Sequence, residues 1–292
     1  MPGEEEGADM ENQDKAEQIW RTRCNPGAWK PLIQGLSRTM VDSIKQSQFG
    51  RNMLKMQLTS LEYRQLCTAL MRTAVYHEEE NLIELRLDGG SLWINEAVIE
   101  HVLDMPRGSD KEPQASEAEV ELEYRSMWRL LDAVSARYPD ESVGRSQRVQ
   151  QEAGSSQTRS NNASSSQRRR ARRAPPQLYA EQRKMFTPAK IRCLFSHWQE
   201  PEFNDLATEP RLVKLLFAVK VERLLLPSQG PYVTKDALRY VYHVDKIDKL
   251  DWPYLVFERM KRDLNLLDKD RLLKYMACCV PVFMVSTRSC CK

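Results

Sequence analysis

The sequence predicts an α+β protein that is mainly α-helical, with a small β-hairpin or three-strand element in its N-terminal half and an all-α C-terminal half. Two observations lead to this fold class. Apolar side chains recur at helical spacing along most of the chain, whereas the alternation typical of half-buried strands occurs only before residue 95. Since 41% of the 292 residues are hydrophobic, the chain can form a sizeable core.

The distribution of apolar residues divides the chain into five segments. Two of them hold too few large apolar side chains to offset the entropy lost on ordering, and both are predicted to be disordered. The segments are a disordered acidic head (1–21), an α+β domain (22–140), a disordered Ser/Arg-rich linker (141–176), a helical region (177–285) and a tail (286–292).

Three elements are predicted before the hairpin. A single amphipathic helix spans 29–50, and apolar residues alternate with polar ones over 54–58, which predicts a short strand. Thr59 followed by Glu62 forms a capping-box pattern. We expect this box to open a helix whose apolar stripe reaches Ala74.

Residues 83–94 predict a β-hairpin. Apolar and polar residues alternate on both sides of the Asp88–Gly90 turn, whose glycines tolerate the backbone angles of a tight turn. Asn95 then suits the N-cap of a short helix, which Pro106 and Gly108 end.

All later elements are predicted to be helices. Most begin at recognisable caps, such as a capping box at Ser116 and Glu119, or Thr187 before Pro188. The expected spans are 116–138, 187–198, 210–226, 251–264 and 268–280.

The cysteines indicate the cellular compartment of the protein, whereas its net charge does not indicate a binding partner. The formal net charge of +3 is nearly balanced, so it indicates no particular class of partner. Seven cysteines, an odd number without a signal peptide, indicate reduced thiols in a nuclear or cytosolic protein. The apolar run Tyr275–Val285 is too short to span a bilayer, so no membrane association is expected.

Two stretches, RCNPGAWKPLIQGLSRTMVDSIKQSQFGRNMLKMQLTSL and LWINEAVIEHVLDMPRGS, resemble transposon-derived plant proteins of the aminotransferase-like plant mobile domain group. That group shows a phenylalanine-glycine pair before a strand and a later strand-helix element ending in proline and glycine. The matching positions are Phe49, Gly50, Val98, Val102, Leu103, Pro106 and Gly108. The chain departs from the group at Gln48 and Asp104, where glycine is usual, so the resemblance does not carry glycine turns to these positions.

The second half extends this resemblance. LLFAVKVERLLLPSQGPYVTKDALRYV and DKIDKLDWPYLVFERM are similar to the group's helix ending in leucine-proline and to its tryptophan-led helix. The likeness covers about 23–107 and 186–280. The resemblance implies a transposon-derived origin. The ending MVSTRSCCK predicts a truncated chain, and some relatives carry a ubiquitin-like-protein protease domain downstream.

The sequence predicts no enzymatic activity and no cofactor. A pyridoxal enzyme needs a Schiff-base lysine, a partner for the ring nitrogen and a phosphate site, and none can be assigned despite the group's name. The pair His197-Trp198 suggests a protease histidine, but no cysteine stands in the expected sequence context. We therefore interpret His197 as a histidine at a helix end beside a core tryptophan.

No metal site is predicted either. Cys193 and His197 could supply two zinc ligands from one helix face, but no second pair is spaced for a tetrahedral site, and Cys193 is interpreted as a buried thiol. HEEE, at 77–80, is interpreted as a solvated loop. Three aspartates at three-residue spacing are interpreted as a charged surface that ends in a helix cap. They are Asp245, Asp248 and Asp251.

An arginine run in the linker is the one candidate functional segment. Its members are Arg168, Arg169, Arg170, Arg172 and Arg173. Runs of this kind serve as nuclear-localisation segments or bind polyanions in a salt-dependent way. The run lacks interleaved aromatic residues for base stacking, so we favour a nuclear-localisation segment over a nucleic-acid-binding segment.

These observations predict a non-enzymatic macromolecular-interaction module in the nucleus, otherwise in the cytoplasm, with unknown protein partners. One alternative is a sequence-nonspecific nucleic-acid-binding fragment of a transposon product, which binds weakly through the arginine run. Another is the remnant of a larger protein whose ubiquitin-like-protein protease domain is missing.

Overall fold

The computed structural model describes residues 30–55, 73–87, 89–142, 186–203, 208–228 and 232–270. The elements in chain order are α2 (Lys30–Gln34), α3 (Arg38–Lys45), α4 (Gln48–Lys55), β1 (Ala74–His77), β2 (Leu82–Leu87), β3 (Gly90–Ile94), α6 (Glu96–Leu103), α7 (Glu117–Arg137), α8 (Pro139–Ser142), α11 (Pro188–His197), η2 (Pro201–Phe203), α12 (Glu209–Lys220), η3 (Val221–Leu225), α13 (Lys235–Val241), η4 (Val244–Lys249) and α14 (Trp252–Asp270). The predicted fold class is confirmed, because the described residues are mainly helical and hold one three-stranded sheet, in the N-terminal half.

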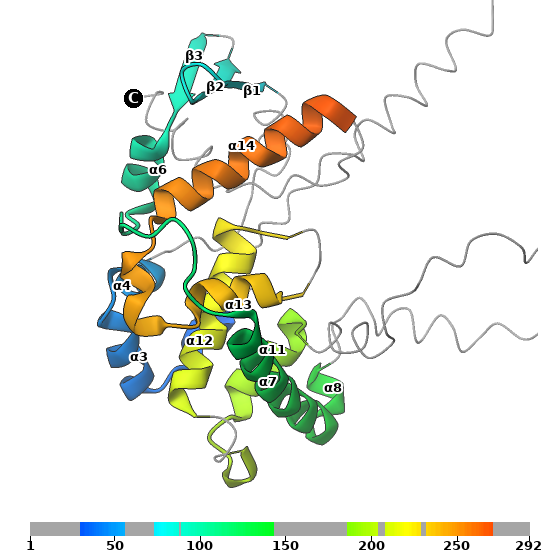
Figure 1. The fold of residues 1–292 in the computed structure, drawn as a ribbon. Helices are drawn as coiled ribbons and strands as arrows, with labels where there is room; N and C mark the ends of the chain where they lie inside the picture. Colours follow the sequence, from blue (N-terminus) through cyan, green and yellow to red (C-terminus); the bar gives the residue numbers. More distant parts are fainter. Residues whose placement is uncertain are drawn as a thin grey trace, which may run out of the picture.

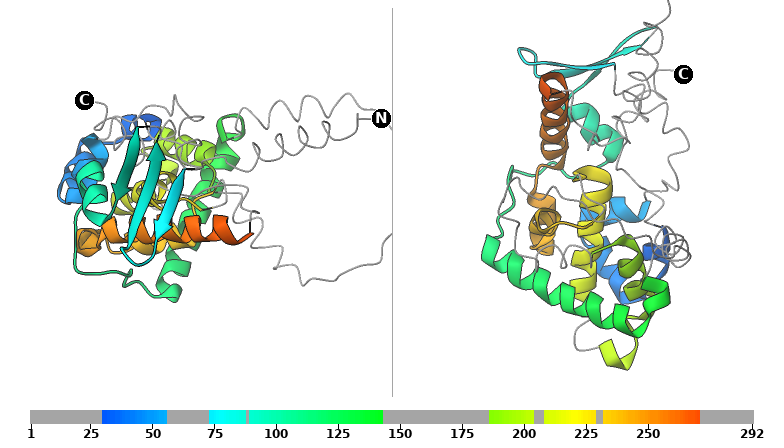
Figure 2. Two further views of the ribbon diagram at one scale, coloured as in Figure 1. Left: turned by 90° about the horizontal axis from the view of Figure 1, so that it is seen from above. Right: turned by 90° about the vertical axis from the view of Figure 1, so that its right-hand side faces the viewer.

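The sheet lies at one end of the molecule, across α14 and beside α6 (Figures 1 and 2). Its strands are antiparallel in the order β1-β2-β3, and Ile83 pairs with Ile94 while Leu85 pairs with Leu92. Ile83, Leu85 and Ile94 are fully buried, whereas Trp93, on the opposite face, is 45% exposed. The predicted hairpin is therefore confirmed.

The single helix predicted over 29–50 is wrong, because the chain forms α2, α3 and α4 in succession. A Cβ at Gly35 would lie 2.6 Å from the carbonyl oxygen of Phe195, so the turn after α2 admits the backbone of α11. Ser37 then caps α3 by accepting a hydrogen bond from the Met40 N–H at 3.1 Å. Packing against a distant helix thus divides a continuous apolar stripe.

The strand predicted over 54–58 is also wrong where the structure describes it, since Leu54 belongs to α4. Met56, Leu58 and the helix predicted from Thr59 lie outside the described residues, and Ala74 begins β1 instead of ending a helix. The third strand of the sheet is β1. Alternation over only three apolar residues did not distinguish a strand from a helical turn.

The helix α6 begins as predicted and ends in an unusual conformation. Asn95 accepts a hydrogen bond from the Val98 N–H at 3.0 Å. Asp104, where the resembling group has glycine, adopts a left-handed conformation with φ of 49°. Asn52 of α4 donates hydrogen bonds to the carbonyl oxygens of Leu103 and Asp104, which holds this helix end in place.

The capping box of α7 is confirmed, because the hydroxyl of Ser116 and the carboxylate of Glu119 each accept from the other residue's N–H. The predicted start of α14 is also confirmed, since Asp251 accepts from the Tyr254 N–H at 3.1 Å. The break predicted between 264 and 268 is wrong, because α14 is continuous from Trp252 to Asp270. α13 and η4 were not predicted.

Aromatic rings from both halves meet in one core. The Phe49 ring lies 4.6 Å from the Trp252 ring and 5.1 Å from the Phe217 ring, between centroids. The fully buried ammonium of Lys220 lies 4.2 Å from the Phe49 ring centroid and donates to the Phe49 carbonyl oxygen and Asn52 Oδ1, both at 3.1 Å. The described parts of the two predicted domains share one hydrophobic cluster, and the domain limits stay a prediction.

A carboxylate from η4 caps the start of α4. Asp248 accepts hydrogen bonds from the N–H groups of Gln48 at 2.6 Å and Phe49 at 2.9 Å. Asp251 is only 7% exposed, while Asp245 is exposed. The predicted charged surface is therefore wrong for Asp248, whose carboxylate caps α4, whereas the helix cap predicted at the end of this surface is confirmed at Asp251.

Candidate functional site

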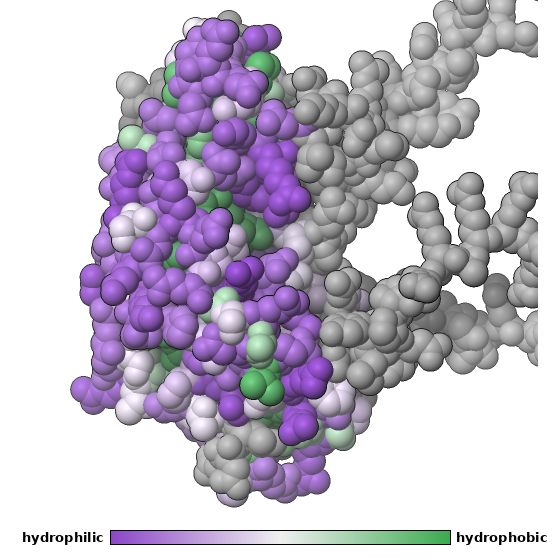
Figure 3. All heavy atoms as spheres, viewed as in Figure 1, coloured by the Kyte–Doolittle hydropathy of each residue, from purple (hydrophilic) through white to green (hydrophobic). Residues whose placement is uncertain are grey.

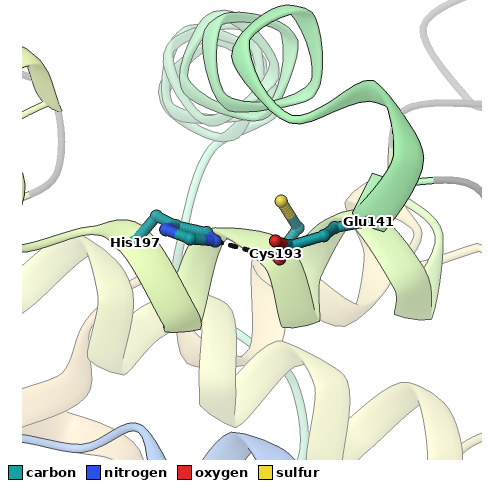
Figure 4. Close-up of side chains that lie close together, drawn as sticks. All are labelled: Glu141, Cys193 and His197. Atoms are coloured by element: carbon teal, nitrogen blue, oxygen red, sulfur yellow. Dashed lines mark hydrogen bonds and ion pairs between the residues drawn. The ribbon is translucent and has the colours of Figure 1, made fainter.

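Side chains with acid-base and metal-ligating chemistry gather where α8 meets α11. These two helices flank residues 143–185, which lie outside the described part of the chain. Cys193 and His197 lie four residues apart in α11, and Glu141 extends toward them from α8 (Figure 4). The His197 cluster consists of Tyr138, Glu141, Cys193, His197 and Glu200.

The imidazole of His197 lies between two carboxylates. Its Nε2 is 2.9 Å from Glu141 Oε2, and its Nδ1 is 2.9 Å from Glu200 Oε1. The Tyr138 hydroxyl donates to both carboxylate oxygens of Glu200, at 2.6 and 2.5 Å. The Tyr138 ring also stacks on the imidazole, with centroids 3.8 Å apart. The ring orientation of His197 is thus fixed on three sides.

The electrostatics of the cluster favour a charged imidazole and charged carboxylates. Burial lowers the pKa of His197, but hydrogen bonds to Glu141 and Glu200 outweigh this effect, and the pKa is raised. Hydrogen bonds from Tyr138 and His197 lower the pKa of Glu200. The Glu200 carboxylate in turn raises the pKa of Tyr138.

Among the described residues, Cys193 is the one cysteine, and its thiol is free and buried, as predicted. Burial, together with the charges of Glu141 and Glu200, raises the pKa of this thiol to about 11. The thiol is therefore protonated at neutral pH, which is unlike the thiolate that a cysteine protease requires. The interpretation of Trp198 as a core residue is confirmed, since it is 8% exposed.

A second candidate is a cleft of about 790 Å³ between α13, α14 and the segment around residue 112. Its floor includes the buried side chains of Val221, Ala237 and Leu255, and Tyr240 adds an aromatic wall. Burial, followed by the nearby Asp236 carboxylate, raises the pKa of Tyr240, so its hydroxyl stays protonated. An apolar floor with polar groups converging on it is typical of binding sites.

Charges of both signs line the cleft. The cationic side chains are Arg239, Arg259, Lys261 and Arg262. The anionic side chains are Glu112, Asp236 and Glu258. Several of these charges are paired within the protein, since Glu258 lies 3.1 Å from Lys261 and Arg259 lies 3.3 Å from Asp263. Within the described ranges, Arg262, Asp236 and Glu112 are exposed and form no ion pair, so they are open to a ligand.

The arginine run from Arg168 to Arg173 lies outside the described residues. Of HEEE, the glutamates at 78–80 form an exposed turn as predicted. His77 instead belongs to β1, where its Nε2 lies 2.9 Å from Glu84 Oε2.

Comparison with protein-family models, with curated proteins and with solved structures finds no match. The resemblance to the plant mobile domain group therefore stays a prediction. Among the described residues, no helix combines the length and the apolar character needed to cross a bilayer. On the face drawn in Figure 3, hydrophilic side chains predominate and apolar ones gather in small groups.

Sequence reasoning found Cys193 and His197 but not their neighbours. Glu141 precedes Cys193 by 52 positions, and no local pattern links the two residues. Glu200, three residues after His197, was visible as a carboxylate at helical spacing. The residues of the cleft were missed because α13, which forms one wall, was not predicted.

Proposed function

We propose that the protein is a non-enzymatic, nuclear interaction module of the plant mobile domain type, and that its cleft binds an extended segment of a partner protein. The observation that carries this proposal is the apolar floor of the cleft beneath unpaired charges of both signs. Such a surface suits a peptide with an apolar anchor between an acidic and a basic residue.

The anionic groups of the cleft favour a peptide over a nucleic acid. Asp236 and Glu112 lie exposed at the cleft and would repel a phosphate backbone. Arg262 is an exposed donor for a carboxylate of the partner, and a guanidinium can bind it through two hydrogen bonds. Charges of both signs also fix the direction in which a peptide binds.

A random peptide library displayed on phage, selected on the immobilised full-length chain, tests the cleft. The double variant Asp236→Lys with Arg262→Glu reverses two exposed charges without touching the core. We expect the selected peptides to carry an apolar residue between charged ones, and to bind this variant at least about 10-fold more weakly.

The matched control is Arg129→Glu, which reverses an exposed charge on α7 outside the cleft and should leave peptide binding unchanged. Peptides that bind the cleft variant as tightly as the parent chain would contradict the proposal. If no peptide is enriched and unrelated DNA duplexes bind instead, the protein is a sequence-nonspecific nucleic-acid-binding fragment that binds through the arginine run. Five arginine contacts then predict a log-log salt slope no steeper than about 4 to 5.

We attribute nuclear localisation to the arginine run. Replacing Arg168, Arg169, Arg170, Arg172 and Arg173 by glutamine should abolish nuclear enrichment of a tandem fluorescent fusion that is too large to diffuse through nuclear pores. The purified variant should keep its melting temperature, because the run contributes no apolar side chain to a core. Unchanged nuclear enrichment would show that the arginine run is not the nuclear-localisation segment.

A further inference from the structure

The His197 cluster brings together three different metal-ligating groups. The ligand atoms of Glu141, Cys193 and His197 all lie within 4.8 Å of one another. Figure 4 shows the Glu141 carboxylate beside the imidazole, with the Cys193 sulfur on the same side of α11. We propose that these three side chains bind a zinc ion, with water as the fourth ligand.

The geometry requires only a small adjustment. Zinc lies about 2.0–2.3 Å from nitrogen, oxygen and sulfur ligands, so the ligand atoms of a tetrahedral site lie roughly 3.3–3.6 Å apart. Cys193 and His197 lie one turn apart in α11, and the Glu141 side chain, 54% exposed, already lies 2.9 Å from His197 Nε2. Because the three ligand atoms lie within 4.8 Å of one another, side-chain rotations are enough to bring them to these distances.

The remaining nitrogen of His197 has the partner expected of a zinc ligand. Metal-binding histidines usually donate their second ring N–H to a carboxylate, which fixes the tautomer and orients the ring. Here Nδ1 lies 2.9 Å from Glu200, and the Tyr138 hydroxyl holds that carboxylate in turn. With Nδ1 committed to Glu200, Nε2 is the atom directed at the zinc position.

Zinc, rather than calcium or magnesium, fits this ligand set. Thiolate and imidazole are preferred by zinc, whereas calcium and magnesium take oxygen ligands. On binding, the hydrated Zn²⁺ exchanges all but one of its waters for His197 Nε2, Cys193 Sγ and a carboxylate oxygen of Glu141, while the Nε2–H and Sγ–H bonds break and the two protons pass to solvent. A doubly charged ion replaces two protons, so the net charge of the cluster is unchanged.

Titration of the reduced full-length chain with Co²⁺ tests the site, because tetrahedral Co²⁺ bound to thiolate has intense visible bands and an ultraviolet charge-transfer band. We expect both bands in the parent chain and competition by Zn²⁺. Cys193→Ser should remove the charge-transfer band. Glu200→Gln changes the partner of Nδ1 and of the Tyr138 hydroxyl without removing a proposed zinc ligand, so it should keep the band but weaken Co²⁺ affinity about 10- to 100-fold.

Six other cysteines require a control. A variant in which Cys24, Cys67, Cys278, Cys279, Cys290 and Cys291 are serine should keep the bands. Should Cys193→Ser fail to fold, Glu141→Ala tests the same site from an exposed position, and it should abolish Co²⁺ binding at the concentration that saturates the parent chain. Absence of a charge-transfer band in the parent chain, or an affinity unchanged by Glu141→Ala, would overturn the proposal.

Discussion

Charged side chains in the core and in the His197 cluster are stabilised by different kinds of partner. At the start of α4, Asp248 accepts from two main-chain N–H groups, and the fully buried Lys220 donates to the main-chain carbonyl of Phe49 as well as to Asn52 Oδ1 and Met105 Sδ. In the cluster, His197 and Glu200 bond to other side chains, and Glu141 is 54% exposed. Main-chain partners fix where a helix lies, whereas exposed side-chain partners can exchange for an ion. The core charges therefore serve stability, and the cluster is free to serve a ligand.

The strongest test of this contrast is Lys220→Met, which keeps the apolar stem and removes the ammonium. The Phe49 carbonyl and the Asn52 amide oxygen would lose a donor in the interior. At about 1–3 kcal/mol for each unsatisfied group, we expect a loss of roughly 3 kcal/mol or more in unfolding free energy, measured by urea denaturation. Lys55→Met, at a side chain 73% exposed, should change it by under about 1 kcal/mol. Equal losses of unfolding free energy for Lys220→Met and Lys55→Met would show that the buried ammonium is no more important for stability than an exposed one.

A smaller effect is expected for Asp248→Ala, which removes the carboxylate that caps α4. The N–H groups of Gln48 and Phe49 would lose their acceptor, and the loss of a helix cap typically costs about 1–2 kcal/mol. Asp245→Ala, an exposed aspartate of the same turn, is the matched control and should stay within about 0.5 kcal/mol. If both variants are equally stable, Asp248 is a surface charge after all.

The smallest effect is expected at the sheet, where Glu84 depends on side-chain partners as the His197 cluster does. Hydrogen bonds from Ser91, His77 and Arg86 lower the pKa of Glu84 from 4.5 to about 2. Because the folded pKa is below the unfolded one, this stabilisation is present above about pH 4.5 and is lost as the pH falls toward 2.

Chemical denaturation of Glu84→Gln and the parent chain at several pH values measures this effect. The difference between their unfolding midpoints should be largest at neutral pH and should shrink through the acid range. Glu78→Gln, in the exposed turn nearby, should show no such trend. A difference for Glu84→Gln that does not vary with pH would assign the effect to packing instead of charge.

Local signals predicted the fold where the determining contacts are local. The caps at Asn95, Ser116 and Asp251 were recognisable because donor and acceptor lie three residues apart. The divided N-terminal helix was not predictable in this way. The turn that separates α2 from α3 depends on the close approach of the Phe195 backbone to Gly35, which only the folded chain reveals.

The candidate site follows the same rule. The spacing of Cys193 and His197 in α11 was visible in the sequence, while Glu141 reaches them only because α8 packs on α11. The cleft depends on α13, whose seven residues hold only three buried apolar side chains, a stripe too short to indicate a helix from the sequence. Sequence reasoning therefore found parts of the His197 cluster and none of the cleft.

The cap of α4 by Asp248 also has a consequence for synthesis of the protein. Gln48 and its acceptor Asp248 are 200 residues apart, and Phe49 packs on Trp252. At about 5–20 residues per second, a ribosome needs roughly 10–40 s to make the intervening chain. During that time the apolar face of α4 lacks its final neighbours, so the nascent chain is a natural client for chaperones until α14 emerges.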